Sequence, residues 1–473
     1  MSSINATWER VHRNKNDLII KNLCVSVPSK VLCSECDISL TFRNKYGIVG
    51  NNGAGKSTLL SILKDIYGSD AYTLQQFSDN VSSDSVIDSV LHSDTEAVIL
   101  KKRLDELNGD DDTDDSFEYT DDVLEEIQQI EDRLKYKSQK HDAMKILAGL
   151  GFDLVKIQGQ TCELSGGWNQ RLCLAKALFS QPNVLMLDEP CNHLDYNGIL
   201  WLSEYLEHYK NTVIVVAHDI HFLDQFCDWF ICVHNKELKY LKTIESVFKF
   251  MNIDDATSFE FDESSYAVRK TASIKVLDVS FAYDNENDVL QDIDMNIDCN
   301  DRFVITGQNG CGKSTLLKLI AGNLQPTMGR IEKDFQLRVL YLDQHSIAKI
   351  NTDITPMQFL KGLYSNETTT DLHKAMSKFG VTKENRMKKL TLLSGGEKAR
   401  ILYAMIALKQ AHILLLDEPS NHLDMESTVA LANALKSFKG GVLIVTHNNI
   451  LIDSIKNDKT KIMTVNKCLL KII

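Results

Sequence analysis

Two stretches of the sequence carry the residue types that bind phosphate groups. Residues 50–58 read Gly-Asn-Asn-Gly-Ala-Gly-Lys-Ser-Thr, and residues 307–315 read Gly-Gln-Asn-Gly-Cys-Gly-Lys-Ser-Thr. A Gly-x-x-x-x-Gly-Lys-Ser loop turns its backbone N–H groups towards an anion, and the helix that follows adds a favourable dipole. The lysine of such a loop reaches the β- and γ-phosphates of a nucleotide, and the serine ligates Mg²⁺. The predicted nucleotide-binding residues are Gly50, Asn51, Asn52, Gly53, Ala54, Gly55, Lys56, Ser57 and Thr58 in the first loop and Gly307, Gln308, Asn309, Gly310, Cys311, Gly312, Lys313, Ser314 and Thr315 in the second.

Each half of the chain also carries an Asp-Glu pair directly after a short apolar run, at residues 188–189 and 417–418. Apolar runs of this length are too short for helices and fit strands that are buried on both faces. The aspartate is placed to reach a metal ion, and the glutamate to orient and deprotonate an attacking water. The next apolar strand in each half ends in a histidine, which we predict to bond the γ-phosphate or hold the water. The predicted catalytic residues are Glu189, Glu418, His218 and His447.

The motifs recur in the same order, which indicates an internal repeat. Leu-Ser-Gly-Gly at 164–167 returns at 393–396. Its serines, the aspartates and the histidines each lie 229 residues from their counterparts, whereas the loop lysines lie 257 apart. The chain is therefore a duplicated module, and the first copy carries 28 more residues between its loop and its Ser-Gly-Gly motif.

Strands that alternate with helical patterns, such as 168–179 and 397–408, predict an α/β fold with a mostly parallel sheet in each module. We predict a first domain at 1–247, a linker at 248–271 and a second domain at 272–473. Ser-Gly-Gly before a helix is a second phosphate-binding end, but it cannot serve a loop that already holds its phosphates. We therefore expect two modules head to tail, each closing over the other's nucleotide. The predicted closing residues are Ser165, Gly166, Gly167, Ser394, Gly395 and Gly396.

Composition limits the class of protein. With 43% apolar and 25% charged residues the chain is not disordered overall. The chain has neither an apolar run of about 18 residues nor the apolar core of a secretory signal, so we expect a soluble, cytoplasmic protein. Eleven cysteines in a long chain do not indicate a disulfide framework. Fourteen of the 65 acidic residues lie between residues 105 and 132, a segment without Lys or Arg that is either solvated or docks on a basic partner.

These motifs resemble those of ATP-binding cassette ATPases, and in particular the F subfamily (ABC-F), soluble twin-cassette proteins that act on ribosomes. The resemblance covers residues 19–473. Its most specific marks are Asn-His-Leu-Asp after both Asp-Glu-Pro triplets, Leu-Ser-Gly-Gly-Trp in the first module and Leu-Ser-Gly-Gly-Glu-Lys-Ala-Arg in the second. The stretch 146–152 resembles the eukaryotic branch. The resemblance implies two tandem cassettes, each with a helical signature subdomain, that hydrolyse ATP with Mg²⁺ to drive a ribosome-associated step in translation or its regulation.

By this resemblance, site one combines the first loop and its Asp-Glu pair with the second Ser-Gly-Gly, and site two is the reverse combination. Tyr283 would stack on adenine in site two, whereas Val27 stands at the aligned position of the first module. The loop lysine and the family's metal-contacting glutamine are 20 residues apart in the first module and 31 in the second, so eleven residues of the adenine-side sheet are missing from the first. The predicted metal-contacting residues are Ser57, Gln76, Asp188, Ser314, Gln344 and Asp417, and the adjacent Gln75 is the alternative to Gln76.

The linker departs from the family. Residues 248–271 hold three basic and five acidic side chains, whereas family members commonly carry a long basic helical hairpin that reaches towards tRNA. The linker therefore argues against direct tRNA contact, and the expected partners are the ribosome or its proteins and a translation-regulatory protein. The acidic segment lies where the family has an arm that contacts the ribosomal surface. Two alternatives stay open: an ATPase subunit that energises a separate membrane transporter, and a slow ATP-switched adaptor.

Overall fold

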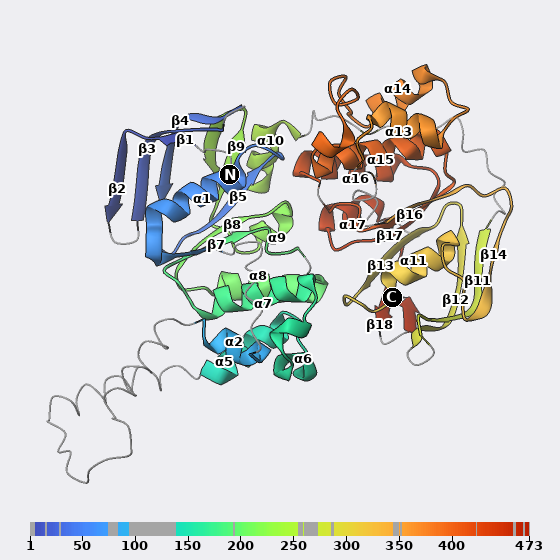
Figure 1. Ribbon diagram of the computed structural model, residues 1–473, viewed down its shortest axis with the longest axis horizontal. Coiled ribbons are helices and arrows are strands. Elements are labelled where there is room, and N and C mark those ends of the chain that lie inside the picture. The colour runs from blue at the N-terminus through green and yellow to red at the C-terminus, as the bar shows by residue number, and fades with distance from the viewer. Residues whose placement is uncertain are drawn as a thin grey trace, which may run out of the picture.

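The chain folds into two modules that face each other, the first drawn in blue to green and the second in yellow to red (Figure 1). The computed structural model describes residues 5–14, 17–27, 30–73, 84–93, 139–192, 194–253, 259, 273–284, 288–343, 350, 352–421, 423–456, 460–466 and 469–472. The acidic segment 105–132 and most of the predicted linker lie outside these residues.

The first module is built on a six-stranded sheet in the order β10-β9-β5-β8-β7-β6, parallel except for the edge strand β10. Its strands are β5 (Lys45–Gly50), β6 (Ala71–Thr73), β7 (Val184–Asp188), β8 (Thr212–Val216), β9 (Trp229–His234) and β10 (Glu237–Leu241). All five residues of β8 are buried because helices cover both faces of the sheet. These helices include α1 (Lys56–Tyr67), α8 (Tyr196–Glu207), α9 (Ile220–Asp224) and α10 (Ile244–Met251).

The second module repeats this sheet as β19-β18-β13-β17-β16-β15, again parallel except for its last edge strand, β19. Its strands are β13 (Arg302–Gly307), β15 (Val339–Leu342), β16 (Ile413–Asp417), β17 (Gly441–Val445), β18 (Thr460–Asn466) and β19 (Leu469–Ile472). Its covering helices include α11 (Lys313–Ala321), α16 (Met425–Ser437) and α17 (Asn449–Ile455). The equal strand order confirms the predicted α/β fold and its duplication.

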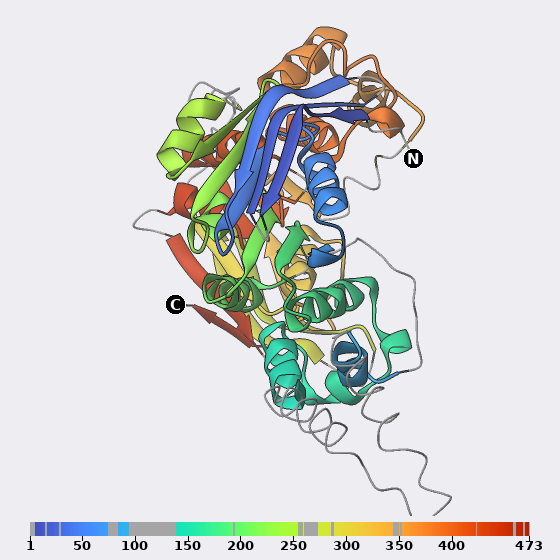
Figure 2. The ribbon, with the colours of Figure 1, turned by 90° about the vertical axis from the view of Figure 1, so that its left-hand side faces the viewer.

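In each module a smaller antiparallel sheet lies beside the helix that follows the phosphate loop, as Figure 2 shows for β1–β4 and α1. Its strands are β1 (Asn5–Thr7), β2 (Arg10–Asn14), β3 (Asp17–Val27) and β4 (Lys30–Leu40) in the first module and β11 (Ser273–Ala282), β12 (Asp288–Asp298) and β14 (Met328–Lys333) in the second. In the second module, β14 pairs with the edge of β11 that β12 leaves free.

The first module lacks a counterpart of β14 in the described stretch between α1 and β6. The corresponding edge of β3 is covered by the N-terminal strands β1 and β2 instead. The chain takes 15 residues from Lys56 to the start of β6 but 26 from Lys313 to the start of β15. The eleven residues that the sequence showed as missing are therefore this strand and its turns.

Each module also has a helical subdomain that ends in the helix after Ser-Gly-Gly. Its helices are α2 (Val86–Leu91), α5 (Gln139–Gly149), α6 (Leu154–Gln158) and α7 (Gly166–Phe179) in the first module and α13 (Pro356–Leu363), α14 (Thr369–Lys378) and α15 (Gly395–Lys409) in the second. Helices α7 and α15 confirm the two helical patterns expected from the sequence. Across the described part of the chain, every helix is too short or too polar to cross a lipid bilayer, and the cysteines form no disulfide bond.

Candidate functional site

Both predicted phosphate loops connect a central strand to a helix, β5 to α1 and β13 to α11. The glycine before each lysine adopts a left-handed conformation, with φ of 99° at Gly55 and 101° at Gly312. This backbone conformation disfavours any residue with a side chain. A Cβ on Gly55 would also crowd Leu32, because it would lie 2.9 Å from Leu32 Cδ1. The glycines thus let the loop curl closely above the helix N-terminus, the geometry that binds phosphate.

The loop lysines are folded back into their own loops. Lys56 Nζ donates to the carbonyl oxygens of Gly50 at 2.8 Å and Asn51 at 3.3 Å. Lys313 Nζ does the same to Gly307 at 2.6 Å and Gln308 at 2.8 Å. Both ammonium groups are buried, and burial lowers the pKa of Lys56 although Glu189 and two aspartates oppose that shift. Each ammonium is therefore held inside its own loop by two backbone carbonyl groups.

The structure brings a hydroxyl and a carboxylate together in the second module. Burial raises the pKa of Asp417, at the end of β16, and a hydrogen bond from Ser314 at the start of α11 opposes that rise. One serine and one carboxylate, with phosphate and water supplying the other oxygens, are a donor set that fits Mg²⁺. Ser57 and Asp188 hold the same places on α1 and β7. The predicted glutamine ligands, Gln76 and Gln344, lie outside the described residues.

The two glutamates sit on a strained backbone that the sequence did not reveal. Glu189 has φ of 51° and Glu418 has φ of 48°, a left-handed conformation that costs a non-glycine residue on the order of 1–3 kcal/mol. The neighbouring strand fixes each one, because Glu189 N–H donates to Val216 O and Glu418 N–H to Val445 O, both at 2.8 Å. Each carboxylate is thereby turned away from its own strand towards the next.

Each glutamate meets the predicted histidine at that next strand end. His218 Nε2 lies 3.3 Å from Glu189 Oε1, and His447 Nε2 lies 3.4 Å from Glu418 Oε1. Burial raises the pKa of both glutamates to about 8, with Lys56 and Lys313 opposing the shift, and burial lowers the pKa of His447 to about 4. In the second module, a carboxylate that titrates near neutral pH lies beside a neutral imidazole, and such a carboxylate suits a general base because proton transfer is most efficient when the pKa lies near the working pH.

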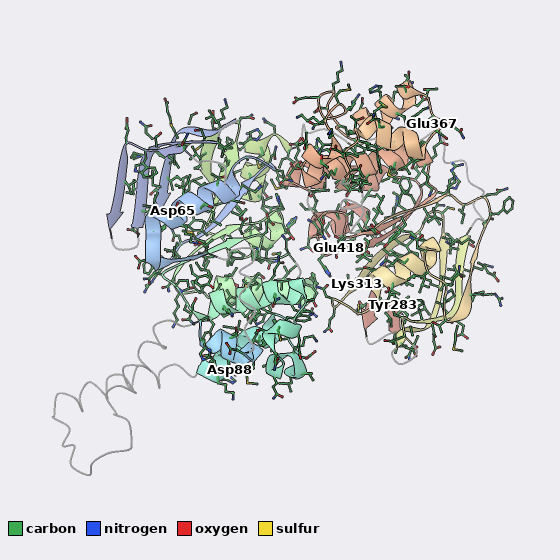
Figure 3. All side chains as sticks on the ribbon, viewed as in Figure 1. Asp65, Asp88, Tyr283, Lys313, Glu367 and Glu418 are labelled. Carbon is green, nitrogen blue, oxygen red and sulfur yellow. The ribbon has the colours of Figure 1, made fainter. Side chains whose placement is uncertain are left out.

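A cavity of about 1060 Å³ runs between the modules and is lined by Glu189 and His218 of the first and by Glu418 and His447 of the second. Figure 3 shows Tyr283, Lys313 and Glu418 along the face of the second module that looks towards the first. Ser165 and Gly167 of the first module line this cavity together with the second loop and Glu418. The predicted site residues that line the cavity are Asn52, Ser165, Gly167, Glu189, His218, Tyr283, Asn309, Gly310, Gly312, Lys313, Ser314, Thr315, Ser394, Gly395, Asp417, Glu418 and His447.

Two carboxylates of the second module reach the first loop directly. Asn51 Nδ2 donates to Glu426 Oε2 at 2.9 Å, and the backbone N–H of Asn52 donates to Asp424 Oδ2 at 3.3 Å. Neither acid was among the site residues predicted from the sequence. Asp424 could have been predicted, because it ends the repeated Asn-His-Leu-Asp motif. Glu426 could not, because the aligned residue of the first module is Asn197 and the position is therefore not repeated.

The two Ser-Gly-Gly motifs differ in what holds the serine. Ser394 and Glu397 form a capping box in which Glu397 Oε2 accepts from Ser394 N–H at 2.8 Å and Glu397 N–H donates to Ser394 Oγ at 3.3 Å. Trp168 replaces that glutamate in the first module, and Ser165 makes no capping bond to α7. Two cations lie over the indole ring instead. The Arg171 guanidinium is 4.5 Å and the Lys156 ammonium 4.9 Å from the ring centroid.

Tyr283, which the sequence predicts to stack on adenine, lines the cavity between the modules. Its side chain is 62% exposed, its ring packs edge-on against Phe281 at 4.9 Å, and its hydroxyl lies 3.1 Å from Thr315 Oγ1. A ring fixed at its edge with its face open can stack on a base. The first module has only Val27 at this place.

The sequence and the fold of this chain are similar to those of known proteins. A family model described as "ABC transporter" matches residues 34–192 and 290–421. The chain is 32% identical over 542 residues to "ABC transporter F family member 4" of Arabidopsis thaliana, covering 96% of this chain and 74% of the relative. It is 32% identical over 500 residues to "Protein GCN20" of Saccharomyces cerevisiae, covering 90% of this chain and 66% of that relative. The archaeal ribosome recycling factor aABCE1, solved with the ribosomal stalk protein aP1, shares the fold with a TM-score of 0.60 at 21% identity, over 96% of this chain and 86% of that one.

Proposed function

This chain belongs to the ABC-F family of ATP-binding cassette ATPases, and from that premise we propose that it hydrolyses ATP at two composite sites to drive a ribosome-associated step in translation or its regulation. The observation that supports the composite sites is the cavity between the modules, which both Ser-Gly-Gly motifs line together with residues of both phosphate loops. A site built from one module alone would not need the second Ser-Gly-Gly motif at its wall.

The residues of each site divide the reaction between them. The loop amides and the loop lysine bind the β- and γ-phosphates, while Ser-Gly-Gly of the other module closes over the γ-phosphate. Glu189 or Glu418 accepts a proton from the attacking water, and the adjacent histidine holds that water. Ser57 with Asp188, and Ser314 with Asp417, would hold Mg²⁺, which when bound neutralises charge on the phosphates.

The ribosomal part of the proposal rests on family membership and on charge. The structural neighbour is a ribosome recycling factor solved with a ribosomal stalk protein. Residues 105–132 add 14 carboxylates, which would be attracted to a basic protein surface and repelled by exposed RNA phosphates. We therefore propose docking on ribosomal proteins, with cytoplasmic localisation, a translation-regulatory protein as a further partner, and no direct tRNA contact by the linker.

Ribosome co-sedimentation with ATP, with ADP and without nucleotide tests the proposal. We expect the full chain to pellet with ribosomes in ATP, and the Glu189→Gln/Glu418→Gln variant to do so more completely because it cannot hydrolyse the ATP. Recovery with membranes instead of ribosomes would favour the transporter alternative. Ribosome binding with negligible steady-state turnover would favour the adaptor.

A deletion and a linker exchange locate the docking element. Removing residues 110–122 should weaken ribosome binding more than replacing residues 260–271 of the linker with a neutral segment of equal length, an exchange that leaves the buried Ile253 and Phe259 in place. Added salt should weaken the wild type more than the deletion, because screening acts on the charges that the deletion removes. If the linker exchange abolishes binding and the deletion is harmless, the acidic segment is not the docking element.

A further inference from the structure

One residue of the predicted linker is buried in the second module. Phe259 is 3% exposed, and its ring centroid lies 5.3 Å from that of Phe379 and 6.1 Å from that of Tyr403. Ile253 lies six residues earlier, shortly after the end of α10, and is buried in the core of the first module. Six residues span at most about 21 Å, so the chain between the modules is anchored in both cores across a short distance.

The anchored phenylalanine touches a tyrosine that reaches the Asp-Glu-Pro motif. Tyr403 lies on α15, the helix that begins at the second Ser-Gly-Gly, and is 4% exposed. Its hydroxyl donates a hydrogen bond to the carbonyl oxygen of Pro419, the residue directly after Glu418. The backbone of Glu418 is therefore held on one side by Val445 and on the other, through Pro419, by α15.

The first module has no equivalent of this bond. The residue 229 positions before Tyr403 is Leu174 on α7, whose alkyl side chain cannot donate to the carbonyl of Pro190. Phe259 belongs to the core of the second module. The series of contacts from Phe259 through Tyr403 to Pro419, the residue after Glu418, thus belongs to the second module.

We propose that Tyr403 is a positioning residue for Glu418, and that Phe259 fixes Tyr403 so that the link between the modules sets the geometry of site two but not of site one. Glu418 holds a strained φ of 48°, and a strained residue keeps its place only while its neighbours constrain it. The second loop binds ATP from a different element, α11, so loss of the constraint should slow hydrolysis without weakening ATP binding. The proposal rests on hydrolysis at site two and is independent of the ribosome.

Single-site enzymes separate the two halves of the proposal. The Glu189→Gln variant turns over ATP at site two only, and the Glu418→Gln variant at site one only. Tyr403→Phe, which removes one hydroxyl and keeps the ring, is placed in each background. Phe259→Leu, which keeps an apolar side chain but removes the ring contact, is placed in the same two backgrounds.

The first module offers a matched control. Tyr209 is 8% exposed, and its hydroxyl donates to the carbonyl of Pro182 at 3.0 Å, so Tyr209→Phe removes the same kind of buried bond away from both sites. Thermal unfolding of all variants shows how much of any change is a general loss of stability.

We expect Tyr403→Phe to lower kcat about three- to tenfold in the Glu189→Gln background, with KM for ATP within about twofold, because one buried hydrogen bond is lost. Phe259→Leu should lower kcat in the same background by a smaller factor. Neither change should alter kcat in the Glu418→Gln background, and Tyr209→Phe should lower the unfolding temperature without changing kcat in either.

Two results would overturn the proposal in distinguishable ways. If Tyr403→Phe leaves kcat of the site-two enzyme unchanged, or lowers it equally in both backgrounds or no more than Tyr209→Phe does, the positioning role is wrong while site two remains catalytic. If the Glu189→Gln background itself hydrolyses no ATP, site two is not catalytic, and the positioning role is wrong with it.

Discussion

The two modules share their chemistry and differ in what surrounds it. Strand order, loop geometry, the left-handed glutamate and the glutamate–histidine contact are the same in both halves, down to φ of 51° and 48°. The surroundings differ at the aligned pairs Val27 and Tyr283, Leu174 and Tyr403, and Asn197 and Glu426. With the composite sites assigned as proposed, site two gains two tyrosines and site one gains an extra carboxylate. Duplication has kept the reacting groups and diversified their supports.

The largest expected effect removes what the two sites have in common. Replacing both Glu189 and Glu418 with Gln should lower ATP hydrolysis by about 10²–10⁴-fold, because the general base is lost from each site. ATP binding should stay within about twofold and the closed state should accumulate, since both phosphate loops are unchanged. Turnover and equilibrium binding of labelled ATP measure the two quantities. Hydrolysis close to the wild-type rate would place the base elsewhere.

The pKa of Glu418 predicts a pH-dependent stability. Burial raises this pKa from 4.5 to about 8, so the folded chain binds more protons than the unfolded chain between these values and loses stability as pH rises through that window. The Glu418→Gln variant has no carboxyl group at this position, so its stability does not fall in this way. The free energy of unfolding of the variant minus that of the wild type should therefore rise by about 2–3 kcal/mol between about pH 5.5 and 8.5. Urea unfolding at both pH values measures it, and a gap that does not change with pH would contradict the shift.

The aromatic difference predicts unequal nucleotide affinity. Tyr283→Ala should weaken ATP binding at site two about fivefold, since an aromatic stack contributes on the order of 1 kcal/mol. Tyr283→Phe is the control, because it keeps the ring and removes only the hydroxyl near Thr315. Titration of the Glu189→Gln/Glu418→Gln enzyme resolves the two affinities. Unchanged affinities in the alanine variant would show that Tyr283 does not stack on adenine.

The smallest expected effect comes from the charge difference. Glu426→Gln keeps an oxygen that can accept from Asn51 but removes a negative charge beside the first loop. ATP should then bind site one about twofold tighter, an effect that weakens with added salt. Asn197→Glu should produce the opposite change at site two. Equal responses of both sites to either substitution would show that the charge acts over the whole cavity.

The sequence predicted the parts of the molecule that depend on local pattern. The repeated motifs and short apolar runs were sufficient for the two parallel sheets and for helices α7 and α15. The spacing after Lys56 revealed that a strand was missing, but not that β1 and β2 cover the free edge, because that pairing joins distant segments. The bonds from Asn51 to Glu426 and from Tyr403 to Pro419 depend on packing between separate elements, which no periodicity encodes.

The central claim is that each site is completed by the other module. The most direct test measures the effect of one Ser-Gly-Gly substitution on ATP turnover in both single-site enzymes. Ser165→Ala removes a hydroxyl from the first Ser-Gly-Gly motif, which lines the cavity together with Lys313 of the second loop. In the Glu189→Gln enzyme, where only site two works, this change should lower ATP turnover by about tenfold or more. In the Glu418→Gln enzyme, where only site one works, turnover should stay within about twofold. The reverse pattern, with loss at site one and not at site two, would contradict the head-to-tail arrangement.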